Sequence, residues 1–224
     1  MKENDKLNDI ILIGGDEMSE EEIEASGWDS ITETFERIYP NQKEPLHFGT
    51  LIKWRFGGSD PLDGISIYDA GEYYHFVTYG LSELYEKESE NEEYSGYGFE
   101  FTLKLKKNSD IDDNELKCIA GILQTLARMT FENGEIFRTY EYIYTGQETG
   151  MDSKGISKIT GFITIPDKEA GVIDTPNGQV EFVQLVGMTD KELKTLLNKK
   201  RSDVQELAEK LQIELTDYSR DDLI

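Results

Sequence analysis

Hydrophobic and polar residues alternate without a break along residues 99–106, which read FEFTLKLK. This period of two predicts a β-strand with one face buried and the other face in solvent. Segments rich in β-branched and aromatic residues predict further strands. These segments are residues 47–56, 65–67, 76–79, 136–144, 156–165 and 180–186.

Helical spacing of apolar residues predicts the helices. The first begins near Trp28 and ends before Pro40, because proline cannot continue a helix. A longer helix covers residues 113–132, with Asp112 as its N-cap and Gly134 beyond its end. Strands and helices in mixed order, without repeated βαβ units, predict an α+β fold with a mixed, largely antiparallel sheet.

Capping-box patterns predict short helices near both ends of the chain. Ser19 with Glu22 marks one near the N-terminus, and Ile10–Ile13 could add an edge strand or a staple. Thr189-x-x-Glu192 and Ser202-x-x-Gln205 each precede an amphipathic helix. We expect these two helices to pack on the core, although their apolar faces also fit self-association. The sequence does not fix the oligomeric state.

Two adjacent segments are candidates for structure and for binding. Asp60, Pro61, Asp63 and Gly64 predict a turn, because proline fixes φ, aspartate bonds nearby amides and glycine tolerates positive φ. The following loop carries acids and tyrosines that could grip a basic protein surface, although a mobile solvated loop is the simpler alternative. These candidate partner-binding residues are Tyr79, Glu83, Tyr85, Glu86, Glu88, Glu90, Glu92, Glu93 and Tyr94.

The chain is strongly acidic, with 23 Lys and Arg, 46 Asp and Glu, and a net charge of −23. Such a surface disfavours nucleic acid and anionic membranes, which need clustered positive charge. It would attract a basic protein partner and speed the encounter, although solubility alone also explains it. With no long apolar run or signal peptide, we expect a cytoplasmic protein.

The sequence offers little catalytic chemistry. Cys118 is the single cysteine, so no intrachain disulfide forms, and its place beside an apolar helix face predicts a buried structural thiol. His47 and His75 could pair with carboxylates as an acid–base set or as metal ligands, but they lack the spacing of a zinc site. We predict no catalytic residue, no metal and no cofactor.

Several ordered blocks resemble one known family over residues 27–190. They are Gly27-Trp28-Asp29, His47-Phe48-Gly49-Thr50, GGSDPLDG at 57–64, YGLSELY at 79–85, GYGFE at 96–100 and TPNG at 175–178. Together they resemble the Suppressor of fused family. The resemblance implies the fold of that family's N-terminal domain, here residues 26–188. An acidic segment, 1–25, would precede this core, and the helices of 189–224 would pack on it.

The resemblance also implies a protein that works by holding other proteins. Bacterial relatives of this single-domain form often look like immunity proteins, so our first hypothesis is an antitoxin that covers a basic toxin domain, possibly a nuclease. In the family, the neighbourhood of the acidic loop lies near the partner-binding surface. The alternative hypothesis is a scaffold or regulator that captures an extended peptide by adding it as a strand to a sheet edge.

Overall fold

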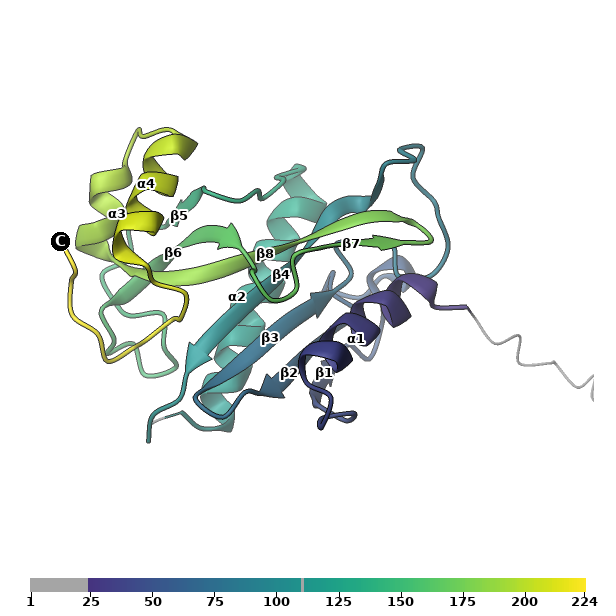
Figure 1. Cartoon of the computed structure of the whole chain (residues 1–224), viewed down its shortest axis with the longest axis horizontal. Helices are drawn as coiled ribbons and strands as arrows, with labels where there is room; N and C mark the ends of the chain where they lie inside the picture. Colours follow the sequence, from purple (N-terminus) through teal and green to yellow (C-terminus); the bar gives the residue numbers. More distant parts are fainter. Residues whose placement is uncertain (1–23, 110) are drawn as a thin grey trace, which may run out of the picture.

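A pair of parallel strands forms the centre of the fold. The structure, a computed structural model, describes residues 24–109 and 111–224. Its eight-stranded sheet has the order β1-β2-β3-β4-β8-β6-β5, with β7 also paired to β8 (Figure 1). Only the pairing of β4 with β8 is parallel among these strands. The strands are β1 (Leu46–Gly49), β2 (Gly64–Asp69), β3 (Tyr73–Tyr79), β4 (Tyr94–Lys106), β5 (Tyr142–Tyr144), β6 (Ile159–Pro166), β7 (Val172–Thr175) and β8 (Gly178–Thr189).

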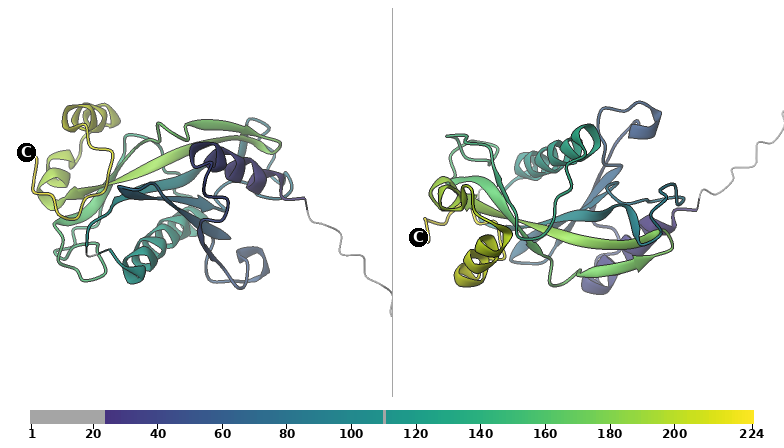
Figure 2. Two further views of the ribbon diagram at one scale, coloured as in Figure 1. Left: turned by 60° about the horizontal axis from the view of Figure 1, so that its bottom comes forward. Right: turned by 90° about the horizontal axis from the view of Figure 1, so that it is seen from above.

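Helices cover both faces of this sheet (Figure 2). The helix α2 (Asp113–Asn133) packs Ile119 and Leu123 on one face, against side chains such as Leu103. On the other face, α1 (Ser26–Ile38) buries Ile31 and Phe35. The predicted α+β architecture, with a mixed and largely antiparallel sheet packed with helices, is therefore confirmed.

This two-sided cover corrects the expectation that β4 has one solvated face. Glu100 and Thr102 are fully buried and Lys104 is only 3% exposed. Alternation in the sequence indicates which side chains share a face, but not what covers that face. Here α1 and the segment after β6 cover the polar side of β4, and each polar side chain has partners inside the protein.

The helix ends follow the predicted capping chemistry in two of three cases. Asp112 accepts hydrogen bonds from Asn114 N and Glu115 N at the start of α2, and Gly134 ends it at a φ of 72°. Thr189 and Glu192 form the expected capping box of α3 (Asp190–Leu196). The Ser202 pattern is wrong. The N-cap of the helix α4 (Arg201–Leu211) is Lys200, two residues before Ser202, and Lys200 N donates to the Asp203 carboxylate.

Some strands in the structure are shorter than the segments predicted from the sequence. Only Tyr142–Tyr144 of the segment 136–144 pairs as a strand. After β1 the segment 50–63 leaves the sheet and contains the 3₁₀ helix η1 (Trp54–Phe56). The strand β7 was not predicted. Its alternation is short, and Val172 is exposed rather than buried.

The C-terminal helices pack on the far end of the sheet. Leu193 and Leu196 of α3 and Val204 of α4 join Ile163 and Val186 in a third apolar cluster. The predicted strand at Ile10–Ile13 and the helix after Ser19 lie outside the described residues. In the described part of the chain, no helix is both long enough and apolar enough to cross a membrane.

Glycine permits one close contact that positions α1. Gly27 N and Trp28 N donate to Leu84 O, at 3.0 and 3.1 Å, and a Cβ on Gly27 would lie 2.1 Å from Glu83 O. We therefore expect Gly27→Ala to lower the free energy of unfolding by about 1–3 kcal/mol. Denaturant titration of the purified protein measures this change.

Gly121 provides the matched control. It lies in α2, and a Cβ on Gly121 would have no neighbouring atom within 4 Å, so Gly121→Ala adds helix propensity without a clash. This variant should gain about 0.5–1 kcal/mol. Equal effects of the two substitutions would contradict the close packing of Gly27.

Candidate partner-binding site

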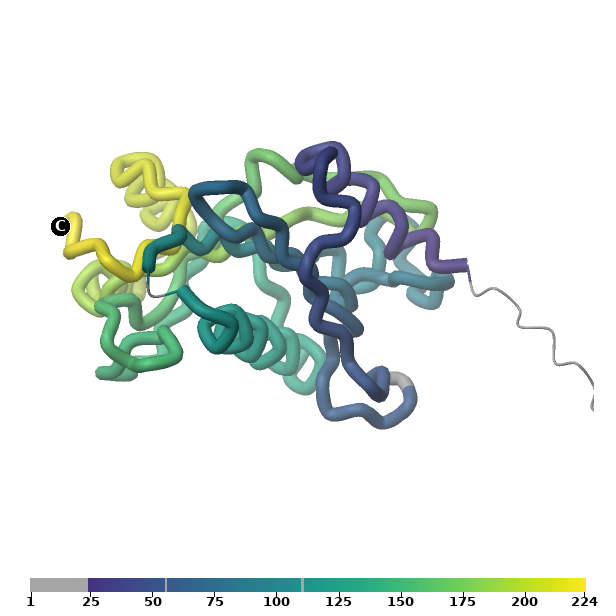
Figure 3. Tube along the Cα trace, turned by 90° about the horizontal axis from the view of Figure 1, so that it is seen from below, coloured from purple at the N-terminus to yellow at the C-terminus, as the bar shows by residue number. Residues whose placement is uncertain are grey.

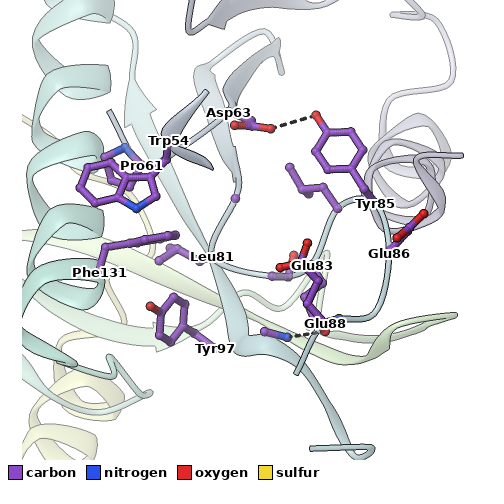
Figure 4. A pocket seen from close by; sticks show the side chains of 14 residues that line it. Trp54, Pro61, Asp63, Leu81, Glu83, Tyr85, Glu86, Glu88, Tyr97 and Phe131 are labelled. Atoms are coloured by element: carbon purple, nitrogen blue, oxygen red, sulfur yellow. Dashed lines mark hydrogen bonds between the residues drawn. The ribbon is translucent and has the colours of Figure 1, made fainter. Parts of the chain in front are cut away.

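The predicted turn and the predicted acidic loop meet around one pocket of about 260 Å³ (Figure 4). One half of its lining is apolar and the other half is acidic. The apolar side chains include Trp54, Pro61, Leu81, Tyr97 and Phe131, whereas Asp63, Glu83, Glu86 and Glu88 line the acidic half together with Tyr85. A pocket with these two halves is suited to a ligand that is both apolar and positively charged.

The turn at 60–64 is fixed against α2 and against the end of β3. The side chain of Gln124 bonds both Leu62 N and Leu62 O, each at 3.1 Å. Gly80 ends β3 at a φ of 139°, and a Cβ there would lie 3.1 Å from Leu62 Cα and from Pro61 O. Only glycine combines this backbone conformation with so close a neighbour.

A buried carboxylate holds the floor of the pocket in place. Glu100 accepts hydrogen bonds from Thr78 Oγ1 at 2.6 Å, Gly80 N at 2.9 Å, Ser82 N at 2.9 Å and Ser82 Oγ at 2.7 Å. Burial raises the pKa of Glu100 to about 7, because the surrounding apolar medium disfavours the charged form more than these donors favour it. The segment 80–82 is thus tied to a single side chain.

Glu83 organises the acidic loop. It accepts from Glu88 N at 2.8 Å, Ser89 N at 2.5 Å and Gly96 N at 3.0 Å, and pairs with Lys87 at 3.0 Å. Burial alone would raise the pKa of Glu83, but the N–H donors and Lys87 outweigh it and lower the pKa. The Glu83 carboxylate therefore makes its hydrogen bonds and its ion pair within the loop.

Tyr85, Asp63 and Lys53 form a second interaction across the pocket. The Tyr85 hydroxyl donates to Asp63 Oδ2 at 2.8 Å. Lys53 Nζ lies 3.4 Å from the same oxygen and 4.0 Å from the centroid of the Tyr85 ring. Lys53 Nζ also donates a hydrogen bond to the Tyr85 hydroxyl, so this ammonium contacts both groups of the pair.

The candidate residues separate into exposed and internal groups. The side chains on the surface are Glu86, Glu88, Glu90, Glu92, Glu93 and Tyr94. Tyr79 is different, because it is 1% exposed and stacks on Trp28 with ring centroids 4.3 Å apart. Its proposed contact with a partner is therefore wrong for this conformation. The turn residues Asp60 and Asp63 both have partners, and Arg128 Nη1 lies 2.7 Å from Asp60.

A second polar cluster is buried under α1, and the sequence did not predict it. His75 Nδ1 lies 2.8 Å from the Tyr39 hydroxyl, and His75 Nε2 lies 2.8 Å from Asp167 Oδ2. Lys104 Nζ lies 3.3 Å from Asp167 and 2.9 Å from Glu169. The cluster joins the end of α1, the strands β3 and β4 and the segment after β6. Nothing in the local sequence around Asp167 indicates that it meets residues so far away in the chain.

The ligand atoms of His75, Asp167 and Glu169 lie close enough together to hold a metal ion. In this structure the Lys104 ammonium contacts both carboxylates, so it supplies the positive charge that a metal would bring. Burial lowers the pKa of His75, which favours the neutral ring that donates one hydrogen bond and accepts another. The side chains of His75 and Asp167 have no exposed surface, and the arrangement acts as a structural link.

The other two candidate residues also have structural partners. Cys118 Sγ lies 3.4 Å from Met151 O, and burial raises the pKa of the thiol, which disfavours the reactive thiolate. His47 Nδ1 lies 3.0 Å from Ser66 Oγ, and its ring packs against Trp28.

The sequence matches the family model of the Suppressor of fused protein over residues 58–221. This chain belongs to the Suppressor of fused family. It is 31% identical to the Suppressor of fused homologs of Homo sapiens and Mus musculus over 170 residues, which is 70% of this chain and 34% of either protein. The chain thus matches about a third of the length of these curated relatives.

Solved structures of family members have the same fold. The match to the Sufu–Fu complex has a TM-score of 0.75 and 30% identity, and covers 88% of this chain and 92% of the other. Drosophila Suppressor of Fused gives 0.76 and 29%, covering 88% of this chain and 51% of the other. A putative homolog from Neisseria gonorrhoeae is similar in fold alone, at 0.57 and 14%, with coverages of 88% and 97%.

The buried cluster leads to a stability prediction. Asp167→Asn removes the carboxylate next to Lys104 and His75, so we expect a loss of about 3–5 kcal/mol in the free energy of unfolding. Burial alone would raise the pKa of Asp167, but the hydrogen bond from His75 and the charge of Lys104 outweigh it and lower the pKa. This stabilisation is therefore present above pH 3.8 and is lost as the pH falls below that value.

Asp221 gives the control for this substitution, because its ion pair with Lys158 is on the surface, with the Asp221 side chain 85% exposed. Asp221→Asn should leave the melting temperature unchanged. A melting temperature of Asp167→Asn equal to that of the wild type would show that the cluster does not stabilise the fold.

Glu100 predicts the opposite pH dependence. Its raised pKa means that the folded state binds a proton between pH 4.5 and about 7 that the unfolded state has lost. Its contribution to stability therefore falls as the pH rises through this range. Glu100→Gln cannot ionise, so its unfolding free energy should fall less than that of the wild type between about pH 5 and 7.5. Parallel curves for the two proteins would contradict the raised pKa.

Proposed function

We propose that this chain is a non-catalytic protein-binding module that captures an extended segment of a partner by adding it as a strand to the β5 edge. The observation that carries this proposal is a difference between the two end strands of the sheet, β1 and β5. Only the β1 end has residues that discourage pairing with a further strand. An end strand offers main-chain N–H and C=O groups to a further strand.

The β1 end carries features that discourage pairing. Lys43, Glu44 and Pro45 come directly before β1, and charges and proline are common protection for edge strands. The β5 strand reads Tyr-Ile-Tyr and has neither a charge nor a proline. Tyrosine is also enriched in protein interfaces, because it supplies a large contact area at low entropic cost.

The side chains of β5 are anchored while its edge is open. Ile143 packs against the apolar cluster between α2 and the sheet, whereas Tyr142 and Tyr144 pack against the apolar cluster formed with α3 and α4. The Tyr144 hydroxyl donates to Asp190 at 2.9 Å, and Asn198 N donates to the Tyr142 hydroxyl at 3.2 Å. A strand held on both faces is a rigid template, which lowers the entropic cost of binding.

Family membership supports a protein-binding role for this chain. A solved relative is a Sufu–Fu complex, so that protein binds another protein. This chain matches 92% of the Sufu-like chain in that structure. The net charge of −23 of this chain favours a basic partner.

The charge also favours a second candidate function, which is an immunity protein that covers a basic toxin domain. The exposed carboxylates of the acidic loop would then speed association through long-range attraction. The two candidates differ in salt dependence. Strand addition rests on main-chain hydrogen bonds and is less sensitive to salt, whereas steering by exposed charges weakens steeply as salt rises.

A first experiment combines affinity capture at low and high salt with hydrogen exchange of the captured complex. We expect slower amide exchange in β5 and unchanged exchange in β1. Protection confined to the acidic loop, together with release by salt, would favour the immunity role and contradict strand addition.

A proline substitution tests the edge directly. Thr164 N donates to Glu141 O, so by alternation Ile143 pairs with Phe162 and Tyr142 N faces away from β6. Tyr142→Pro removes one outward donor and should weaken partner binding about tenfold, the worth of one net hydrogen bond. Isothermal titration calorimetry measures this affinity.

The control is Leu46→Pro at the first residue of β1, a position where proline is tolerated. It should leave the affinity unchanged, and circular dichroism should show that both variants are folded. Equal affinities of the wild type and Tyr142→Pro would rule out strand addition at β5.

A further inference from the structure

The chain between β1 and β2 contains an extension with exposed apolar side chains. This extension, residues 50–58, leaves the sheet after β1 and projects from the body of the protein beside α2 (Figure 3). Leu51 is fully exposed, and Ile52 and Phe56 are 59% and 70% exposed. An exposed apolar surface of this kind marks an interaction site.

We propose that the N-terminal segment of the same chain, residues 1–23, folds back onto the extension and covers it with the apolar run Ile10–Ile13. The segment would then act as an intramolecular cover for a surface that the described residues leave open. This contact goes beyond strand addition at β5 and does not depend on it.

A groove of about 650 Å³ between the extension and α2 offers room for such a run. Sites of this size hold apolar ligands of several groups, so the groove can take aliphatic side chains. Asp60 is the one acidic residue of its lining, and Arg128 Nη1 lies 2.7 Å from that carboxylate. The apolar residues of the lining are Phe48, Leu51, Ile52, Ile65 and Ala120.

The extension differs in charge from the rest of the chain. The whole chain has a net charge of −23, but residues 46–58 contain no acidic residue and include Lys53 and Arg55. Lys53 is paired with Asp63 at 3.4 Å. Lys117 adds an exposed positive charge on α2, one turn before the part of the helix that lines the groove. The surroundings of the groove therefore favour an acidic ligand.

The N-terminal segment has the complementary composition. It contains eight acidic residues and two lysines, and Ile10–Ile13 is its run of consecutive aliphatic residues. Asp9 comes directly before this run, and Asp16 and Glu17 follow it after two glycines. An aliphatic run with acids on both sides matches an apolar groove with basic residues around it.

The start of α1 lies close to the base of the extension. The ring of Trp28, in the first turn of α1, has its centroid 5.5 Å from that of His47 in β1, and the extension follows β1 directly. The link from Ile13 to Glu24 can extend to about 36 Å. Since β1 is an end strand, this link can pass around the edge of the sheet to the side of α2.

The covalent link also decides between this segment and a separate chain. A second copy or another acidic protein would be repelled by the net charge of −23. A tethered segment has an effective concentration in the millimolar range, which compensates for a weak contact.

Disulfide trapping in the full chain tests the contact. Gly14→Cys, next to the apolar run, and Gly121→Cys, in the lining of the groove, are combined with Cys118→Ser. A Cβ on Gly121 has no neighbouring atom within 4 Å, so the substitution is tolerated. Equilibration with glutathione gives the effective concentration of the two thiols for each other.

Val172→Cys replaces Gly121→Cys in the control chain. Val172 is 55% exposed on β7, and β7 also contacts α1, so the same tether reaches it. We expect the effective concentration of the pair at 14 and 121 to be at least about tenfold higher than that of the pair at 14 and 172. Circular dichroism checks that both chains are folded.

Two double substitutions in the segment test the apolar run without changing the folded body. Ile11→Asp with Ile13→Asp removes the apolar contact and should abolish the difference between the two cysteine pairs. Asn4→Asp with Asn8→Asp adds the same charge outside the run and should preserve the difference.

A third double substitution tests the charges. Asp16→Lys with Glu17→Lys should lower the effective concentration of the pair at 14 and 121 about threefold relative to the control pair, the worth of an exposed ion pair. An increase would contradict charge complementarity.

Equal effective concentrations of the two cysteine pairs would overturn the proposal. A disulfide between two chains, with a yield that rises with protein concentration, would overturn it in favour of a second copy as the cover. Trapping that is unchanged by Ile11→Asp with Ile13→Asp would show that the apolar run does not make the contact.

Discussion

The fold depends on the burial of β4 on both faces. Its apolar face packs against α2, and its other face carries Glu100, Thr102 and Lys104 into the interior. Buried polar groups are costly without partners, so each of them requires a partner from another part of the chain. Glu100 binds the segment after β3, while Thr102 and Lys104 bind Asp167 after β6. The polar face of β4 thereby fixes both the segment after β3 and the segment after β6.

This constraint also positions the candidate binding surfaces. The segment held by Glu100 forms the floor of the pocket, and Gln124 of α2 holds the turn above it. Trp54, from the connection between β1 and β2, packs on Phe131 and completes the wall of the pocket. The β5 strand is held differently, by packing on both of its faces. The pocket and the β5 edge are thus both held in place by contacts with the body of the protein.

The sequence predicts the parts of this fold that depend on local patterns. The helix at 113–132, its cap at Asp112, its end at Gly134 and the α3 capping box all follow from neighbouring residues. The burial of Glu100 and Lys104 does not, because alternation leaves open whether a second layer covers the polar face. Tyr79, a candidate partner-binding residue in the sequence, is instead buried and stacks on Trp28 of α1, a contact that no local pattern indicates. The cluster around Asp167 requires residues that only the tertiary fold brings together, and the pocket wall at Trp54 carries no sequence motif.

The parallel pairing of β4 with β8 has a consequence for the folding rate. Leu103 pairs with Leu185, and α2, β5, β6 and β7 all lie between them in the chain. A ribosome must therefore synthesise most of the protein before its central strand can find its neighbour. Until then the hairpin of β3 and β4 has an unpaired central edge, which is prone to association with other chains. Such non-local pairing predicts slow folding, governed by loop closure and not by helix formation.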